Sequence, residues 1–408
     1  MVVDKKTVFY SLPLFIDFIL KMCNNISMEK IGIFGGTFNP VHSEHIAIAK
    51  SAIEELGLDK LIIMPTFISP HKQQDLALSP EHRLNMLKLA FKGDERIEIS
   101  DYEIEKKGTS YTYLTVEHFF SLQPCELFFI VGGDMLTNFK TWKYPERILA
   151  VCNLAVFSRD GVFTDFSLEK QYFKEHFGKE FIRLSFTGKD FSSTKIRVLS
   201  AFSLPIDHLT PLPVAEYIEK NNLYQFEKYS KYIEFVKKAL PQKRLLHTAN
   251  VVICALSKAK ELNLKEDKVF ISATLHDVAK YLDYRMVDGF TLLDNVPEPV
   301  IHSFLGAFVA EKELGITDPE ILDAIRYHTS GKANMSLLGK LIFVADMVEE
   351  GRDYQGVTYL RELYQKDDFE FCFNECLREE FLHLKNKGTP IYVETLNAYN
   401  YYIKTQEK

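Results

Sequence analysis

The sequence has little of what marks secreted, membrane or nucleic-acid-binding proteins. Its 408 residues contain six cysteines at scattered positions and no C-x-x-C pair, which argues against a disulfide framework and favours reduced thiols in the cytoplasm. Lys and Arg number 49 against 56 Asp and Glu, so the net charge of −7 provides no broad basic field for nucleic acid. Any phosphate must therefore be bound by local features of the chain.

A long apolar run is also missing. The apolar stretch at residues 12–20 resembles the core of a signal peptide, but it contains Pro13 and Asp17, is too short to span a bilayer and precedes no small-residue cleavage site. We expect no membrane partner. Residues 1–27 are expected to be either an extension before a functional start at Met28 or a docking helix.

The remaining composition is that of a folded protein. Hydrophobic residues make up 46% of the chain and charged residues 26%, and the length predicts two or three domains. Near the start, residues 31–34 form an apolar run, Gly35 and Gly36 open a tight turn, and residues 44–56 place apolar side chains on one helical face. Further strands are predicted at residues 60–64, 97–100, 126–131 and 153–157, separated by helical patterns. The first half is therefore predicted to be an α/β domain with a doubly wound, Rossmann-like sheet, whose ligand crevice lies at the carboxyl ends of the strands.

Two histidines stand at the start of the first predicted helix. His42 and His45 are three residues apart, so they occupy adjacent positions on one helical face. The helix N-terminus and the amides of Gly35 and Gly36 attract anions, which favours phosphate binding by this pair. Packing and metal ligation are the alternative roles.

The segment from Gly35 to His45, GGTFNPVHSEH, resembles the nucleotide-binding motif of the nucleotidylyltransferase superfamily. It is most similar to the G-G-T-F-D-P-x-H-x-G-H form of the nicotinate-nucleotide adenylyltransferase family, from which it departs at Asn39 and at Glu44. Glu44 puts a carboxylate near the expected phosphates unless it points outward. Other motifs of that family are matched, in its order, by residues 69–72 (S-P-H-K), 110–112 (S-Y-T), 132–134 (G-G-D) with Trp142, and 192–197 (S-S-T-K-I-R), so that the resemblance covers residues 28–224.

This resemblance implies transfer of the adenylyl group of ATP, bound with Mg²⁺, to nicotinate mononucleotide. Because the attacking phosphate is already largely dianionic at neutral pH, the site needs alignment and positive charge rather than a base. The side chains expected to supply that charge are His42, His45, Lys72 and Arg197. The residues expected to hold the nucleotides are Gly35, Gly36, Thr37, Phe38, Thr112, Gly132, Asp134, Trp142, Ser192, Ser193 and Thr194.

Two of these residues also have ordinary structural roles. The resemblance implies that Trp142 stacks on the nicotinate ring and that Thr112 helps to hold it. Core packing is the ordinary role of a single tryptophan, and Asp134 could instead cap a helix.

The second half is predicted to be all α. Strand patterns vanish after residue 232, and helical periodicity predicts helices at residues 268–281, 303–314, 319–327 and 337–349. His276, Asp277 and Asp346 fall inside strongly apolar stretches, where a carboxylate needs a cation or hydrogen-bond donors. Taken singly, each histidine of this half could be a capping or core residue. Together, the residues that could hold one or two divalent transition-metal ions are His247, His276, Asp277, His302, His328 and Asp346.

The order H…HD…H…H…D resembles the HD phosphohydrolase superfamily, and the local sequences resemble its symmetrical bis(5′-nucleosyl)-tetraphosphatase branch. The resemblance covers residues 231–408. It implies a di-iron centre that hydrolyses diadenosine tetraphosphate to two ADP. Asp277 is the best candidate to bridge both ions and activate the site. Lys280, one helical turn further, is expected to neutralise phosphate, unless it is a solvated surface lysine, and Arg352 is a further candidate for that role.

Two motif sets in separate halves predict a bifunctional cytoplasmic enzyme. Its expected parts are the extension at residues 1–27, an adenylyltransferase domain at residues 28–224 and an HD phosphohydrolase domain at residues 225–408. The alternative is an adenylyltransferase for nicotinamide mononucleotide or pantetheine phosphate, with an HD domain that binds metal and nucleotide as a regulatory module without turnover. Homo-oligomerisation is left open by the sequence.

Overall fold

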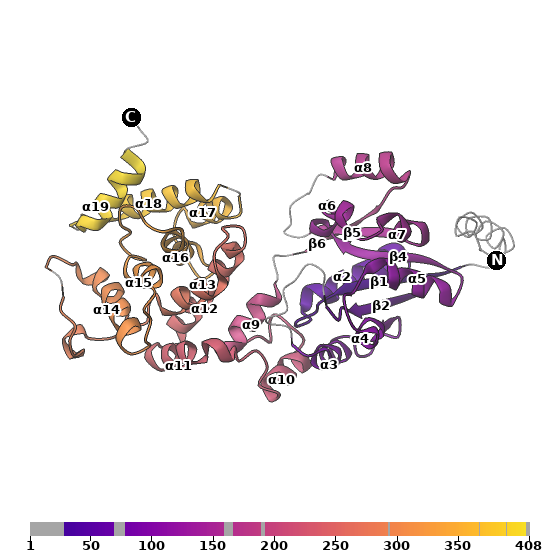
Figure 1. Ribbon diagram of the computed structural model, residues 1–408, viewed down its shortest axis with the longest axis horizontal. Helices are drawn as coiled ribbons and strands as arrows, with labels where there is room; N and C mark the ends of the chain where they lie inside the picture. Colours follow the sequence, from indigo (N-terminus) through magenta and orange to yellow (C-terminus); the bar gives the residue numbers. More distant parts are fainter. Residues whose placement is uncertain are drawn as a thin grey trace, which may run out of the picture. The chain divides into compact units, whose positions relative to one another are not determined.

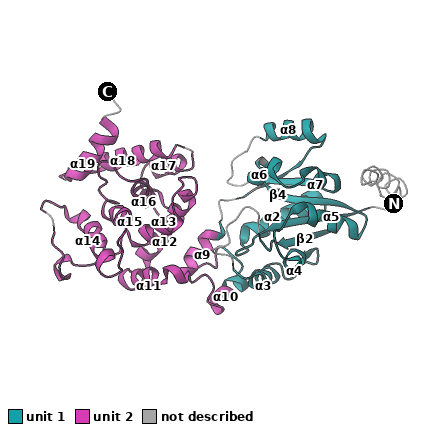
Figure 2. Cartoon of the chain, in the orientation of Figure 1, with its two compact units in different colours: residues 1–193, 209–217 teal, residues 194–208, 218–408 magenta. Residues whose placement is uncertain are grey.

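The computed structural model describes residues 28–68, 78–158, 166–188, 192–292, 294–366, 368–388 and 390–404. These residues form two compact units (Figure 2). The first comprises the described residues up to Ser193 together with Leu209–Tyr217, and the second comprises Thr194–His208 and the described residues from Ile218 onward. The expected domain boundary after residue 224 stays a prediction, because the two units interleave in the sequence before it.

The first unit is built on a six-stranded parallel sheet in the order β3-β2-β1-β4-β5-β6 (Figure 1). The strands are β1 (Glu29–Gly36), β2 (Lys60–Pro65), β3 (Ile97–Ile99), β4 (Cys125–Gly132), β5 (Asn153–Ser158) and β6 (Ile182–Thr187). β2 pairs with one side of β1 and β4 with the other, so the winding of the chain reverses between β1 and β4. In such sheets the ligand crevice lies beyond the carboxyl ends of the strands at this point. The predicted doubly wound α/β fold is confirmed.

The sequence predicts five of these strands and misses β6. β4 reads CELFFIVG and is buried at all but one position, because a parallel sheet is covered on both faces. β6 reads IRLSFT, mixes apolar with polar residues, and lies at the edge of the sheet, where Ile182 is 39% exposed. A continuous apolar run identifies a central strand, whereas a mixed edge strand lacks that signal.

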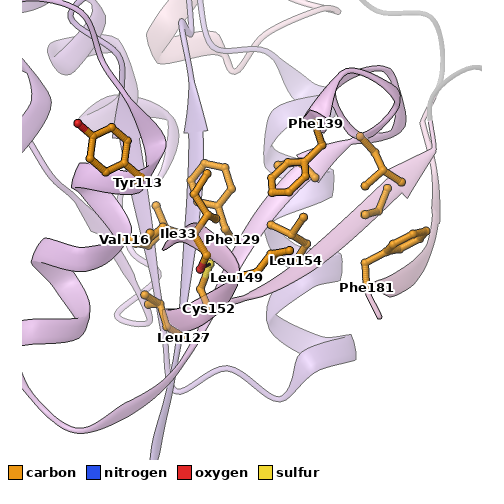
Figure 3. Close-up of a cluster of buried hydrophobic side chains, with 14 of the residues drawn as sticks. Ile33, Tyr113, Val116, Leu127, Phe129, Phe139, Leu149, Cys152, Leu154 and Phe181 are labelled. Atoms are coloured by element: carbon orange, nitrogen blue, oxygen red, sulfur yellow. Dashed lines mark hydrogen bonds between the residues drawn. The ribbon is translucent and has the colours of Figure 1, made fainter. Parts of the chain in front are cut away.

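The helices that accompany the sheet are α2 (Ser43–Leu56), α3 (Pro80–Ala90), α4 (Tyr102–Lys106), α5 (Thr112–Leu122), α6 (Gly133–Thr137), α7 (Pro145–Val151) and α8 (Ser167–Phe177), with a short 3₁₀ helix at Phe139–Thr141. A hydrophobic cluster fixes α5, α6, α7, α8 and the 3₁₀ helix to the sheet (Figure 3). Ile33, Phe129 and Leu154, from β1, β4 and β5, are at most 7% exposed. They cluster with Val116 of α5 and Phe139 of the 3₁₀ helix. Burial of each such side chain contributes about 1.5–3 kcal/mol, which holds the strand ends in place.

The second unit is helical throughout its described part (Figure 1), as predicted. Its helices are α11 (Ser230–Ala239), α12 (Gln242–Ala259), α13 (Glu266–Leu275), α14 (Glu298–Lys312), α15 (Pro319–Arg326), α16 (Leu337–Val348), α17 (Val357–Tyr364), α18 (Phe369–Asn386) and α19 (Val393–Tyr399), followed by a π-helical turn at Asn400–Lys404. α9 (Ser193–Ala201) and α10 (Leu212–Lys220) contain residues of both units. α12 packs against α13 and α16, and α15 packs against α13, α14 and α16.

His276 and Asp277 lie outside the helix in which the sequence predicts them. The sequence predicts them inside a helix at residues 268–281, but α13 ends directly before them and they lie in the following turn. Nδ1 of His276 lies 2.7 Å from the carbonyl oxygen of Ala273, a side-chain contact that competes with continuation of the helix. The apolar pattern nevertheless runs on to Val278, which is fully buried, so periodicity alone does not reveal the helix end.

None of the helices in the described part combines the length and the apolar character that crossing a bilayer requires. Among the described cysteines, which carry free thiols, Cys125, Cys152, Cys372 and Cys376 are buried and Cys254 is partly exposed. Cys23 lies outside the described residues.

Candidate functional sites

The turn after β1 lies at the predicted crevice. β1 ends at Gly36, and His42 is the N-cap residue of α2, with an extended backbone. The backbone N–H of His42 donates to Nδ1 of His45 at 3.3 Å, and the two imidazole rings stack with their centroids 3.7 Å apart. The structure therefore brings the two predicted histidines together at the N-terminus of a 14-residue helix, whose dipole attracts anions.

Phe38 anchors the turn. Its backbone lies in the left-handed region, with φ at 47°, and its buried ring makes edge contacts with Phe34 and His45, at centroid distances of 5.5 and 4.9 Å. A Cβ on Gly36 would lie 3.0 Å from the Phe38 ring, so glycine is needed for this close approach. Gly35 and Gly36 thus have no side chains that would cover the backbone of the turn.

Arg83 holds the turn from the protein interior, and the sequence analysis misses it. Its side chain is 2% exposed, and its Nη1 donates to the carbonyl oxygen of Thr37 at 2.9 Å. Ser193, a predicted nucleotide-binding residue, donates from Oγ to the carbonyl oxygen of Pro40 at 3.0 Å. Arg83 stands 46 residues from Thr37 and lies in no motif, so only the folded chain reveals the contact.

Glu44 and Asn39, the two departures from the family motif, have different surroundings. Asn39 is buried in the turn. One carboxylate oxygen of Glu44 lies 2.7 Å from the position that a Cβ on Gly188 would take, so Glu44 approaches the chain directly after β6. The effect of either residue on ATP binding stays a prediction.

Other predicted nucleotide-binding residues stand at neighbouring strand ends. Gly132 ends β4, the neighbour of β1, and Asp134 lies in the first turn of α6. A Cβ on Gly132 would lie 2.4 Å from Oδ1 of Asp134. Thr112 begins α5, directly after a segment in which Ser110 Oγ accepts a hydrogen bond from the backbone N–H of Phe67 at 3.0 Å. These contacts tie the segment that precedes α5 to the chain that leaves β2.

Trp142 is half-buried on the aromatic core. Its ring lies 5.2 Å from that of Phe139 and 6.2 Å from that of Phe129. Its Nε1 is buried and has no hydrogen-bond partner among the described residues. Core contact is thus present, and stacking on a nicotinate ring stays a prediction.

Four other predicted residues of this site are Lys72, Ser192, Thr194 and Arg197. Lys72 lies outside the described residues. Thr194 and Arg197 belong to the second unit, where Arg197 Nη2 donates to Thr194 Oγ1 at 2.9 Å and burial lowers the pKa of Arg197. Ser192 precedes them and is exposed. Their roles in phosphate binding stay predictions.

The predicted metal ligands converge in the helical unit. His247, His276 and Asp277 form one group, and Asp277, His302 and His328 form a second, with the ligand atoms of each group within 4.8 Å of one another. They come from α12, the turn after α13, α14 and the turn after α15. Elements distant in sequence therefore supply one centre.

Asp277 is shared by both groups, with one carboxylate oxygen toward each. Oδ1 lies 3.0 Å from Nε2 of His302 and 3.5 Å from Nε2 of His328. Oδ2 lies 3.6 Å from Nε2 of His276 and 3.7 Å from Nε2 of His247. Burial alone would raise the pKa of Asp277, but the surrounding imidazoles of His276, His302 and His328 hold it well below its usual range. A carboxylate placed in this way can bridge two cations.

Backbone carbonyls orient two of the histidines. Nδ1 of His276 lies 2.7 Å from the carbonyl oxygen of Ala273, and Nδ1 of His328 lies 2.7 Å from that of Ile325. In this arrangement Nδ1 carries the proton and Nε2 offers its lone pair to the centre. Burial lowers the pKa of His276 to about 3, so its ring stays neutral, the form that binds metals.

Asp346 of α16 completes the first group. Its Oδ1 lies 3.0 Å from Nε2 of His247 and accepts a hydrogen bond from Arg352. Burial alone would lower the pKa of His247, but hydrogen bonds to Asp346 and Glu349 raise it. Glu349, which the sequence analysis misses, is 2% exposed and has Oε1 3.0 Å from Nδ1 of His247. A glutamate three residues after a ligand aspartate is the signal that could have found it, because both then share a helical face.

Basic side chains surround the shared carboxylate. Lys280 Nζ lies 3.1 Å from Nε2 of His302 and 3.9 Å from Oδ1 of Asp277, and burial lowers its pKa. Lys280 therefore contacts two of the proposed ligands, and its role in neutralising phosphate stays a prediction. Arg244, also missed by the sequence analysis, donates from Nη1 to Oδ2 of Asp277 at 2.7 Å. It stands three residues before His247 on α12, on the same helical face.

The donor set fits two divalent transition-metal ions. Four imidazoles and two carboxylates provide a mixed nitrogen and oxygen set, suited to iron, manganese, cobalt or zinc. Two ligand groups that share one carboxylate are also typical of two-ion centres. The structure thus assembles all six predicted ligands.

Two family models match the chain, one in each half. Residues 33–199 match the cytidylyltransferase-like family, and residues 244–351 match the HD domain family. Among solved structures, a predicted HD superfamily hydrolase involved in NAD metabolism from Clostridium acetobutylicum is 31% identical, with a TM-score of 0.40, covering 43% of this chain and 97% of that one.

Two curated relatives cover different shares of the chain. A probable nicotinate-nucleotide adenylyltransferase of Clostridium botulinum (strain Alaska E43 / Type E3) is 42% identical over 202 residues, which are 49% of this chain and 100% of that protein. A probable nicotinate-nucleotide adenylyltransferase/Ap4A hydrolase of Mycoplasma genitalium is 30% identical over 332 residues, which are 79% of this chain and 88% of that protein. The chain therefore belongs to the nicotinate-nucleotide adenylyltransferase family, in the two-part form that carries an HD domain.

Proposed function

We propose that the chain is a bifunctional enzyme. Its first half transfers the adenylyl group of ATP to nicotinate mononucleotide, giving deamido-NAD and pyrophosphate, and its second half hydrolyses diadenosine tetraphosphate to two ADP. The observation that carries the proposal is a stacked histidine pair at the turn after β1 and two possible ligand groups sharing Asp277, in one chain related over 79% of its length to a protein named for both activities.

In the first half, a phosphate oxygen of the mononucleotide forms a bond to the α-phosphorus of ATP, and the bond to pyrophosphate breaks. The attacking oxygen needs no base, because this phosphate is already largely dianionic. His42 and His45, at the N-terminus of α2, would align and neutralise the phosphates together with Mg²⁺. Lys72 and Arg197 would add positive charge around the departing pyrophosphate.

In the second half, the six ligands would hold two ions, which we propose to be iron. Divalent ions at such a centre activate a water molecule and polarise a phosphoryl oxygen. Arg244, Lys280 and Arg352 surround Asp277 and Asp346, so they would neutralise the polyphosphate chain as it approaches. Attack at the middle of the tetraphosphate gives two ADP.

A product assay of the full-length protein tests both halves. With ATP, Mg²⁺ and nicotinate mononucleotide, we expect deamido-NAD and pyrophosphate, and much slower turnover with nicotinamide mononucleotide or pantetheine phosphate. With diadenosine tetraphosphate and iron-loaded protein, we expect ADP alone. Absence of pyrophosphate release would refute the first activity. Intact diadenosine tetraphosphate, or its cleavage to ATP and AMP, would refute the second.

The domain limits at residues 28–224 and 225–408 and the cytoplasmic location stay predictions. Homo-oligomerisation also stays a prediction, and light scattering of the purified protein tests it.

A further inference from the structure

A single arginine outside both ligand groups holds the turn that follows α16. Arg361, on α17, donates from Nε to the carbonyl oxygen of Val348 at 2.8 Å. Its Nη2 lies 2.6, 3.2 and 2.6 Å from the carbonyl oxygens of Glu349, Glu350 and Arg352. One guanidinium thus gathers the backbone carbonyls of the whole turn, which its planar fork of donors allows and the single ammonium of a lysine does not.

This turn carries two side chains that reach the first ligand group. Glu349 Oε1 lies 3.0 Å from Nδ1 of His247, while its Oε2 accepts from the backbone N–H of Gly351. Arg352 donates from Nη2 to Oδ1 of Asp346, and from Nε to the Asp346 carbonyl oxygen at 2.7 Å. The geometry of the turn therefore sets the orientation of one ligand imidazole and of one ligand carboxylate.

The second ligand group takes its support from elsewhere. His328 is oriented by the carbonyl oxygen of Ile325, and Thr329 Oγ1 lies 3.0 Å from Nε2 of His328 and 3.3 Å from Nε2 of His302. Lys280, which precedes His302 in the sequence, also contacts the His302 ring. A change in the turn after α16 should therefore affect the two groups unequally.

We propose that Arg361 is a positioning residue for the first metal subsite, formed by His247, His276, Asp277 and Asp346. The inference rests on the proposed metal centre. Without the guanidinium, the carbonyls of the turn lose their shared donor, and Glu349 no longer holds the His247 ring in place. Loss of the group that orients a ligand imidazole typically weakens metal binding about 10–100-fold. The second subsite, formed by Asp277, His302 and His328, keeps its own supports.

Manganese(II) binding to the full-length chain tests the proposal without any need for turnover. The wild type is expected to bind two ions, and because Asp277 would be shared by both, their electron paramagnetic resonance signal should be that of a coupled pair. In Arg361→Gln, one binding step should weaken about 10–100-fold while the other changes little. Intermediate manganese concentrations should then give the six-line signal of isolated ions. Arg361→Lys should also weaken this binding step, because a lysine ammonium cannot donate to all of the carbonyl oxygens that the guanidinium contacts.

Arg285→Gln is the matched control, because Arg285 is 73% exposed and pairs with Asp283 in the same unit. It should bind both ions as the wild type does. Retention of the second ion in the Arg361 variants also shows that the unit is folded. Unchanged binding, or equal weakening of both steps in Arg361→Gln and Arg361→Lys, would overturn the proposal. If the wild type binds no divalent ion, the proposed hydrolytic centre itself is refuted, and the control then also binds none.

Discussion

Arg244 donates a hydrogen bond of 2.7 Å to Asp277, and it does so to Oδ2, the carboxylate oxygen nearest His276 and His247. The arginine side chain is 24% exposed, whereas that of the aspartate is 3% exposed. A partly exposed guanidinium thus contacts the buried carboxylate. It stabilises the ionised aspartate, and it is placed to contact the phosphates of a substrate that binds there.

Asp277→Ala is expected to lower hydrolysis of diadenosine tetraphosphate by about 1,000-fold or more, because both ligand groups lose their shared carboxylate. Adenylyl transfer in the same preparation should stay within twofold of the wild type. Both rates are measured on full-length protein. Asp283→Ala serves as the control, since that side chain is 41% exposed and pairs with Arg285. A parallel loss of both activities in Asp277→Ala would contradict separate sites.

Chelation should separate the two activities by their metals. After treatment with a chelator and its removal by dialysis, Mg²⁺ alone should restore adenylyl transfer, because that step needs charge neutralisation of phosphates. Hydrolysis should return only with iron, manganese or another transition metal, because the donor set is rich in imidazole. Recovery of hydrolysis with Mg²⁺ alone would show that the histidine groups do not form the metal centre.

Arg83→Met should loosen the turn after β1. The substitution leaves the carbonyl oxygen of Thr37 without its buried donor, at a cost of about 1–3 kcal/mol in stability. The KM for ATP should rise more than that for the mononucleotide. Arg96→Met is the control, because its ion pair with Glu54 is surface-exposed and contributes little. A lower melting temperature with an unchanged KM for ATP would mean that Arg83 is structural only.

The sequence predicts those parts of both sites that lie in short motifs. His42 and His45 stand in one contiguous segment, so their spacing on the helix determines their proximity. His276 and Asp277 are adjacent in sequence, and an apolar neighbourhood marks them as buried charges that need a partner. A local sequence pattern is therefore enough to predict site residues where a single turn or a single helix face holds them.

The supporting residues could not be predicted in this way. Arg83 meets Thr37 because α3, distant in sequence, packs beside that turn, and Arg361 meets the turn after α16 because the next helix, α17, packs back onto it. An arginine on an amphipathic helix is most often a solvated side chain, so its burial is a product of tertiary packing. The end of α13 is hidden for a related reason, since the start of the following turn, from His276 to Ala279, is as buried as the helix.

Trp142→Ala should raise the KM for nicotinate mononucleotide by about tenfold, if the indole stacks on the nicotinate ring, since such stacking is worth about 1–3 kcal/mol. The KM for ATP should change little. Trp142 also contacts Phe129 and Phe139, so Trp142→Phe is the matched variant that keeps an aromatic ring. Its KM for nicotinate mononucleotide should lie between those of the wild type and of Trp142→Ala. Equal increases in both KM values would indicate a packing role.

Glu103 should make the protein's stability depend on pH. Its side chain is buried and Oε1 accepts a hydrogen bond from Thr115 Oγ1 at 2.5 Å. Burial raises the pKa of Glu103 above its ordinary value of 4.5. A carboxyl whose pKa is higher in the folded than in the unfolded chain binds its proton more tightly when folded. Its contribution to stability is therefore complete below about pH 4.5 and is lost as the pH rises through the folded pKa.

Glu103→Gln removes the ionisation and keeps the shape, so the variant should melt at a higher temperature than the wild type at pH 7–8. The difference should shrink as the pH falls toward 4, where the wild-type carboxyl is protonated. Melting curves across this range measure it. Glu98→Gln, in which a 53% exposed side chain of β3 is changed, should show no such pH dependence. A gain for Glu103→Gln that is constant with pH, or largest under acid conditions, would mean that a buried ionised carboxylate is not what limits stability near neutral pH.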